Sequence, residues 1–76
     1  MLMGEQVLDV AGLKCPLPIL RAKKALAALQ AGDVLTVLAT DAGAPDDFAA
    51  FCRQTGHLLL ASEAEGGVFR LVLRHK

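Results

Sequence analysis

Two prolines separated by a single residue, Pro16 and Pro18, do most to restrict how this chain folds. Proline lacks a backbone N–H and is accepted in a helix only within the first turn, where that N–H would have no intrahelical partner. The segment that follows is rich in Ala, Leu and Lys, which favour helix. We therefore expect a helix over residues 16–30 that starts at this motif and is stopped by Gly32.

This helix is predicted to be amphipathic. At 100° per residue, one narrow face collects apolar side chains that we assign to the core: Ile19, Ala22, Leu26 and Leu29. The opposite face carries Leu17, Arg21, Lys24 and Ala28. A basic strip with an apolar centre could dock an acidic partner, and it could equally be the ordinary solvated face of a helix.

Short apolar runs predict four strands around a second helix. The second helix opens at Pro45, where Asp46 and Asp47 suit the positive end of the helix dipole, and Gly56 ends it. A Gly66-Gly67 pair predicts a hairpin turn between the last two strands. The predicted strands are residues 6–10, 34–39, 57–64 and 68–75.

The pattern of the second half indicates which sides are buried. Phe48, Phe51, Cys52 and Thr55 share one helical face, and the last strand alternates, with Phe69, Leu71 and Leu73 on one side. A sheet with one apolar face carries its helices on that side only. The expected fold is an α/β two-layer sandwich of order βαβαββ, with a four-stranded mixed sheet and two helices on one face. The 76 residues predict a single domain, residues 1–76.

Composition excludes several classes of function. Eight basic residues balance eight acidic ones, and the three aromatic residues are all Phe, so direct nucleic-acid binding is not expected. No apolar run is long enough to span a membrane, and the N-terminus lacks the features of a signal peptide. Two cysteines are too few for a disulfide framework. We expect a cytoplasmic monomer.

Cys15 is the residue that we expect to do the work. Placed at the N-cap of the first helix, its sulfur would meet the positive end of the dipole, which favours the thiolate. Because both prolines lack an N–H, the N–H of Leu17 would be the main donor left to the sulfur. Lys14 and Arg21 would add positive charge nearby.

Nothing in the chain suggests that Cys15 works as a self-contained catalyst. The histidines lie far along the chain, no Cys-x-x-Cys pair is present, and two isolated cysteines make a poor metal site. Burial of Cys15 as a packing residue is disfavoured at a helix start flanked by prolines. Cys52 lies on the apolar face of its helix, so packing is the favoured role there. Asp9 could fix the loop before Cys15 or cap an edge, and His57 is expected to be structural or solvated.

The same residues carry a family likeness over about residues 6–74. The chain closely resembles the TusA family of sulfur carriers, also called SirA-like, and the Cys-Pro-x-Pro element is the specific part of the likeness. The matching elements are Leu8-Asp9, Gly12-Leu13, Cys15-Pro16-Leu17-Pro18, the Lys-rich helix, Asp47-Phe48, Phe51-Cys52 and Gly56-His57.

The resemblance implies both fold and function. Such proteins have the βαβαββ sandwich, and their motif cysteine, here Cys15, accepts sulfane sulfur from a cysteine desulfurase or a rhodanese-like donor. The cysteine holds the sulfur as a persulfide and hands it to an acceptor protein, for tRNA thiolation, molybdenum-cofactor synthesis or sulfur oxidation. No metal or organic cofactor is implied. Members that thiolate tRNA commonly carry an acidic residue where this chain has Leu17, beside the sulfur.

We therefore expect a sulfur carrier, sulfurtransferase-like rather than a self-contained enzyme. Gly12, Pro16 and Pro18 would shape the motif, while partners would meet Lys14, Leu17, Arg21 and Lys24. One alternative is a redox-sensing regulatory module, in which Cys15 reacts with oxidants and transfers no sulfur. Another is a structural domain that is bound or fused to a larger transporter or enzyme.

Overall fold

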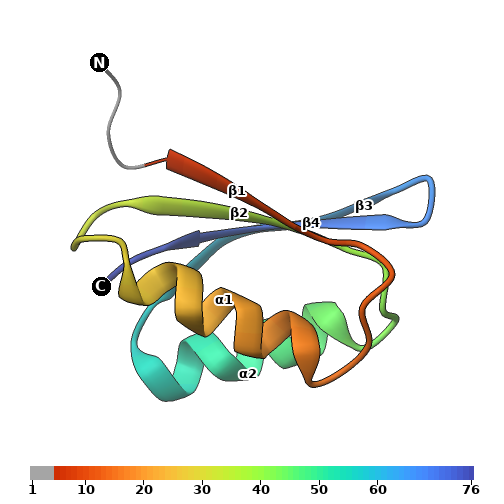
Figure 1. Ribbon diagram of the computed structural model, residues 1–76, viewed down its shortest axis with the longest axis horizontal. Coiled ribbons are helices and arrows are strands. Elements are labelled where there is room, and N and C mark those ends of the chain that lie inside the picture. Colours follow the sequence, from red (N-terminus) through yellow and green to blue (C-terminus); the bar gives the residue numbers. More distant parts are fainter. Residues whose placement is uncertain (1–4) are drawn as a thin grey trace.

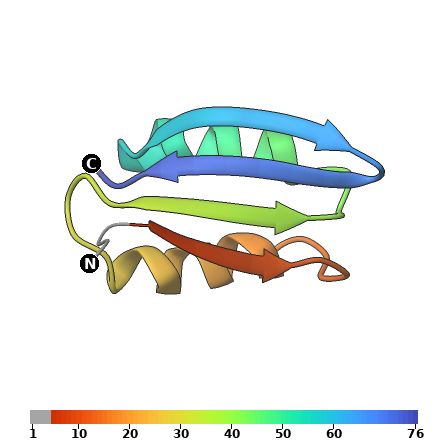
Figure 2. The same cartoon turned by 90° about the horizontal axis from the view of Figure 1, so that it is seen from above.

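The computed structural model describes residues 5–76 and shows one four-stranded sheet with two helices on one face (Figure 1). In chain order the elements are β1 (Glu5–Val10), α1 (Leu17–Ala27), β2 (Val34–Ala39), α2 (Ala44–Thr55), β3 (Leu58–Glu65) and β4 (Val68–Arg74). The strand order is β1-β2-β4-β3, which Figure 2 shows from above. β1 runs parallel to β2, whereas β4 is antiparallel to both of its neighbours. The predicted βαβαββ two-layer sandwich with a mixed sheet is confirmed.

β2 is a central strand, as its almost unbroken apolar run predicts. It lies between β1 and β4. Leu35, Val37 and Ala39 are fully buried beneath the helices, while the alternate residues on the open face remain half-buried. Because strands flank β2 on both edges, neighbouring side chains partly cover the residues of its open face, which fits the apolar Val34 and Leu38 there. The open face of the sheet also carries the Arg70–Glu63 ion pair, whose closest N···O distance is 3.1 Å.

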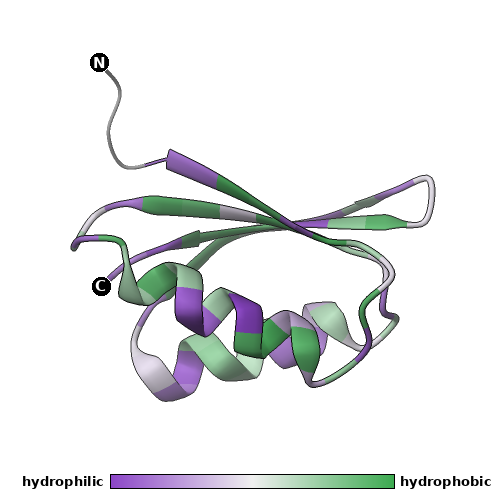
Figure 3. Ribbon diagram, viewed as in Figure 1, coloured by the Kyte–Doolittle hydropathy of each residue, from purple (hydrophilic) through white to green (hydrophobic). Residues whose placement is uncertain are grey.

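The core forms where the apolar faces of both helices meet the sheet. On α1, Ala22 and Leu26 are buried, and Ile19 and Leu29 pack against the core from half-buried positions. On α2 the buried side chains are Phe48, Phe51 and Cys52. The hydropathy colouring of Figure 3 shows both helices alternating between hydrophobic and hydrophilic turns. The predicted core faces of the two helices are therefore confirmed. Neither helix of the described residues is long and apolar enough to cross a membrane.

α1 is shorter than the predicted residues 16–30, because its C-terminal end tightens before Gly32. The N–H groups of Ala28 and Leu29 donate to the carbonyls three residues back, those of Ala25 and Leu26. Such i→i−3 bonds end an α-helix in a tighter turn. Beyond that turn the backbone N–H of Gln30 donates to Asp33 Oδ2 at 2.9 Å, which takes this residue out of the helix.

α2 ends as predicted. Gly56 has a φ of +88°, in the left-handed region that favours glycine, and its N–H donates to the carbonyl of Cys52. β3 starts at Leu58 rather than at His57. His57 instead packs between the rings of Phe51 and His75, and its Nδ1 accepts the N–H of Lys76 at 3.2 Å. Of the two expectations for His57, structural or solvated, these contacts support the structural one.

Candidate functional site

Cys15 is exposed in the turn between β1 and α1. The N-cap of α1 is Pro16, so Cys15 lies one residue before the N-cap and Pro18 is the second helical residue. The Cys15–Pro16 peptide bond is cis. The N–H of Leu17 donates to the carbonyl of Lys14 at 2.9 Å. Both the predicted N-cap position of Cys15 and the predicted donor from Leu17 to the sulfur are therefore wrong.

The loop before Cys15 is fixed by hydrogen bonds to its own strand and to the end of β2. Asp9 Oδ1 accepts the N–H of Ala11 at 3.0 Å, and Thr40 Oγ1 accepts the N–H of Gly12 at 2.8 Å. Gly12 has a φ of +84°, which other residues adopt only with strain. Of the two roles left open for Asp9, the structure shows the first, because its side chain fixes this loop.

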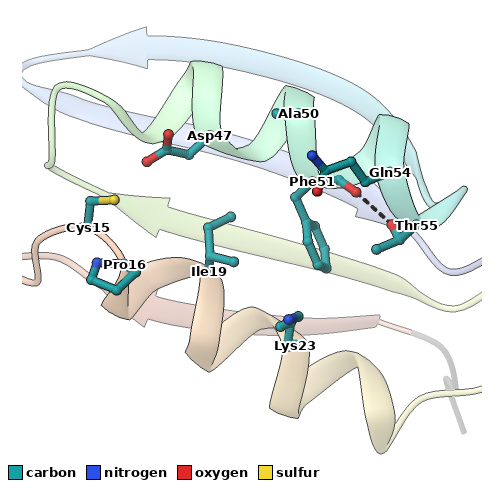
Figure 4. Close-up of a pocket in the computed structure, with 9 residues that line it drawn as sticks. All are labelled: Cys15, Pro16, Ile19, Lys23, Asp47, Ala50, Phe51, Gln54 and Thr55. Atoms are coloured by element: carbon teal, nitrogen blue, oxygen red, sulfur yellow. Dashed lines mark hydrogen bonds between the residues drawn. The ribbon is translucent and has the colours of Figure 1, made fainter.

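A groove between α1 and α2 begins at Cys15 and has a volume of about 310 Å³. Ile19 and Phe51 provide apolar lining, and Lys23 lies toward the far end (Figure 4). Asp47, from the first turn of α2, faces Cys15 across the near end of the groove. The sulfur is therefore exposed to solvent while bordering a concave surface built from both helices.

Carboxylates act on the ionisation of the Cys15 thiol. A hydrogen bond to Asp47 raises the pKa of the Cys15 thiol, and desolvation and the negative charges of Asp47 and Asp41 act in the same direction. The predicted bias toward the thiolate is therefore wrong. Since Cys15 precedes the N-cap, the dipole of α1 helps it less, whereas Asp47 in the first turn of α2 and Asp41 in the loop before α2 favour the neutral thiol.

The outward-facing side of α1 brings together the predicted partner-contacting residues. We call the exposed residues Leu17, Leu20, Arg21 and Lys24 the α1 outer face. Leu17 and Leu20 are 45% and 50% exposed, which is high for leucine. Leu20 was not predicted, although its spacing of i+3 from Leu17 is the signal that could have placed it here. Lys14 is also exposed, in the loop just before Cys15.

Cys52 differs from Cys15 in its burial. Its side chain is only 6% exposed on the core side of α2, and burial raises the pKa of its thiol. Its predicted packing role is confirmed. Both cysteines are free. In residues 5–76, no group of three or more His, Cys, Asp and Glu side chains is arranged to hold a metal ion.

Comparison with known proteins gives a consistent family. Residues 6–75 match the family described as Sulfurtransferase TusA. A protein of Neisseria meningitidis serogroup A, provisionally named a sulfur carrier protein, is 72% identical over 97% of this chain and all of its own length. The sulfur carrier protein TusA of Allochromatium vinosum is 54% identical over 92% of both chains. The crystal structure of a SirA-like protein from Desulfitobacterium hafniense superposes with a TM-score of 0.79 at 33% identity, covering 90% of this chain and 93% of that one. The chain therefore belongs to the TusA family of sulfur carriers.

Proposed function

We propose that Cys15 accepts sulfane sulfur as a persulfide and relays it to an acceptor protein. The observation that carries this proposal is the exposed Cys15 sulfur at the mouth of the groove between α1 and α2, in a chain of the sulfur-carrier family. A group that must pass between two proteins needs exposure and brief docking rather than a deep pocket. The rigid Pro16–Pro18 turn keeps the sulfur at the surface.

The transfer step is redox-neutral. The Cys15 thiolate attacks the outer sulfur of a persulfide on the donor cysteine, and the donor's S–S bond breaks. The electron pair of that bond leaves with the donor's inner sulfur, which takes up a proton. Delivery to the acceptor repeats the same exchange, with Cys15 now the leaving thiolate. Because Asp47 favours the neutral thiol in the free carrier, we expect Cys15 to lose its proton only after a partner has docked.

The proposed donor is a cysteine desulfurase or a rhodanese-like protein. It would dock on the α1 outer face together with Lys14, where basic side chains surround exposed leucines. Such a surface suits a partner that presents acidic groups around an apolar contact. We expect the carrier to act as a single-domain monomer in the cytoplasm, and to supply tRNA thiolation, molybdenum-cofactor synthesis or sulfur oxidation.

The electrostatics of Cys15 disfavour the alternative of an oxidant sensor. Sensor cysteines have low pKa values, because the thiolate is the form that oxidants attack. Asp47 and Asp41 raise the pKa of Cys15, which protects the free thiol from such chemistry. A protected thiol fits a carrier that reacts only with its partners.

Intact-protein mass spectrometry tests the proposal. The carrier is incubated with a cysteine desulfurase and cysteine, or with a rhodanese charged by thiosulfate, and Cys15→Ser is treated in parallel. We expect wild type to gain the mass of one sulfur atom, reversibly by reductant, and the variant to gain none. Equal gain by Cys15→Ser, or no gain from either donor, would overturn the proposal. Cys52→Ser is the matched control, which should load as wild type does.

A further inference from the structure

One charged side chain at the site acts on Cys15 without forming or breaking a bond in the transfer step described above. Asp47 lines the groove opposite Cys15, although the two residues are 32 positions apart and come from different elements. Its backbone is fixed, because its N–H donates to the carbonyl of Gly43 at 2.9 Å as α2 begins. The side chain is half-buried and forms no ion pair within residues 5–76, where Arg70–Glu63 is the pair present. The backbone that carries the Asp47 side chain is therefore held in place beside the groove.

A second carboxylate supports the first. A Cβ built on Gly43 would lie 3.3 Å from Asp41 Oδ2 and 3.6 Å from Asp47 Oδ2, so both acidic groups gather over this glycine. The N–H of Gly43 donates to Asp41 Oδ2 at 3.2 Å, which fixes that side chain as well. Two carboxylates thus lie on the α2 side of the sulfur, and that of Asp41 is fixed by a hydrogen bond.

The other charged residues near Cys15 lie on α1, in the loop before Cys15 and beside Asp47 on α2. On α1, Lys23 lines the groove two turns beyond Pro16, and Lys14 precedes Cys15 in its own loop. Arg21 and Lys24 belong to the α1 outer face, away from the groove lining. Asp46, the neighbour of Asp47, is exposed and does not line the groove. Of the charged groups around Cys15, Asp47 and Asp41 are the ones that raise the pKa of its thiol.

We propose that Asp47 is a positioning residue for sulfur delivery: its carboxylate favours the neutral thiol of the unloaded carrier over the anionic persulfide of the loaded one. This inference rests on the proposed function. A neutral thiol can donate a hydrogen bond to the Asp47 carboxylate, whereas a persulfide is a stronger acid than the thiol and carries a negative charge at neutral pH. The carboxylate attracts the first and repels the second. Asp47 thus biases the carrier toward giving its sulfur away.

The proposal predicts a shift in the equilibrium constant for loading Cys15. Glutathione (GSH) and its persulfide (GS–SH) serve as the probe pair in the exchange Cys15–SH + GS–SH ⇌ Cys15–S–SH + GSH. Asp47→Asn removes the repulsion, so we expect the loaded fraction to rise, with an equilibrium constant about two- to tenfold larger at neutral pH. The difference in this equilibrium constant between wild type and Asp47→Asn should disappear at acidic pH, where the persulfide is protonated and neutral. Asp46→Asn removes the same charge from the same helical turn and should leave the constant unchanged.

A second readout does not depend on sulfur transfer. The rate at which iodoacetamide alkylates Cys15, followed by peptide mass mapping across pH, reports the ionisation of the thiol. The pH at which the alkylation rate reaches half its maximum should be lower in Asp47→Asn than in wild type. It should fall less in Asp41→Asn and stay unchanged in Asp46→Asn. Circular dichroism melts establish that each variant is folded.

The outcomes separate the inference from the function on which it rests. If wild type forms the Cys15 persulfide and Asp47→Asn shows the wild-type loading constant, the inference is overturned while the carrier function stands. An alkylation midpoint that Asp47→Asn leaves in place overturns it as well. If Cys15 takes up no sulfur from any donor, the proposed function itself falls.

Discussion

At the scale of single residues, the two cysteines show what a motif can and cannot predict. The proline-flanked position of Cys15 predicted its exposure, and the helical spacing around Cys52 predicted its burial. The direction in which the pKa of Cys15 shifts was not predictable in the same way. It depends on Asp41 and Asp47, which reach the sulfur only through the packing of α2 against α1.

The same substitution at the two cysteines should separate function from stability. Cys52→Ser places a hydroxyl among apolar neighbours and should lower the free energy of unfolding by about 1–2 kcal/mol. Cys15→Ser replaces an exposed side chain and should change it by less than about 0.5 kcal/mol. Urea denaturation of both variants checks this. A larger loss at Cys15 than at Cys52 would contradict the burial of the two side chains.

His57 should make the folded state sensitive to mild acid. Burial, followed by the positive charges of His75 and Lys76, lowers the pKa of His57. The unfolded chain therefore binds a proton more readily than the folded one, so stability falls as the pH drops below about 6.5. His57→Gln should reduce the difference in unfolding free energy between pH 7.5 and pH 5.5. An unchanged difference would show that His57 does not contribute to it.

At the scale of elements, hydrophobic periodicity predicted the buried face of α1 correctly but placed its C-terminal end too late. Ala22 and Leu26 are buried as predicted, because tertiary packing selects the apolar stripe. The C-terminal end was placed three residues too late. Ala and Leu continue through residues 27–29 and favour helix, whereas i→i−3 hydrogen bonds and the side chain of Asp33 end it earlier.

Two leucines of α1 provide a matched test of this face assignment. Leu26 is 2% exposed and Leu20 is 50% exposed, so the same change to alanine removes very different packing. Leu26→Ala should cost about 2–5 kcal/mol of unfolding free energy, and Leu20→Ala less than about 1 kcal/mol. Denaturation of both variants under one set of conditions measures the two costs. Similar costs would contradict the packing of α1 on the sheet.

At the scale of the whole molecule, the element order was predictable but the strand order was not. Alternation along the last strand showed which side faces the helices, and this placed both helices on one face. It gives no information about which strands are neighbours. The insertion of β4 between β2 and β3 was therefore visible only in the structure.

Although the net charge is zero, basic and acidic residues lie on different parts of the surface around Cys15, and this separation matters for docking. Cys15 lies between the basic α1 outer face and the acidic start of α2, which includes Asp46 and Asp47. A partner that presents an acidic surface to α1 would be steered toward the sulfur, and salt would weaken that steering.

Charge reversal on α1 should slow loading by the donor. The double variant Arg21→Glu, Lys24→Glu should lower the rate of sulfur acquisition from the desulfurase or rhodanese about three- to tenfold at low salt. The difference should shrink as salt is added. Arg53→Glu changes an exposed charge in the last turn of α2, outside the groove beside Cys15, and serves as the control. Equal slowing by Arg53→Glu would show a general charge effect instead of a docking surface.

The most direct test of the carrier role is cyanolysis of the loaded protein after the donor has been removed. Cyanide attacks the outer sulfur of a persulfide, releases thiocyanate and restores the thiol. We predict one thiocyanate per Cys15 persulfide, with return of the protein to its unloaded mass and no thiocyanate from Cys15→Ser. A mass gain on Cys15 that yields no thiocyanate, as a sulfenic acid or a glutathione adduct would, contradicts the account and favours the redox-sensing alternative.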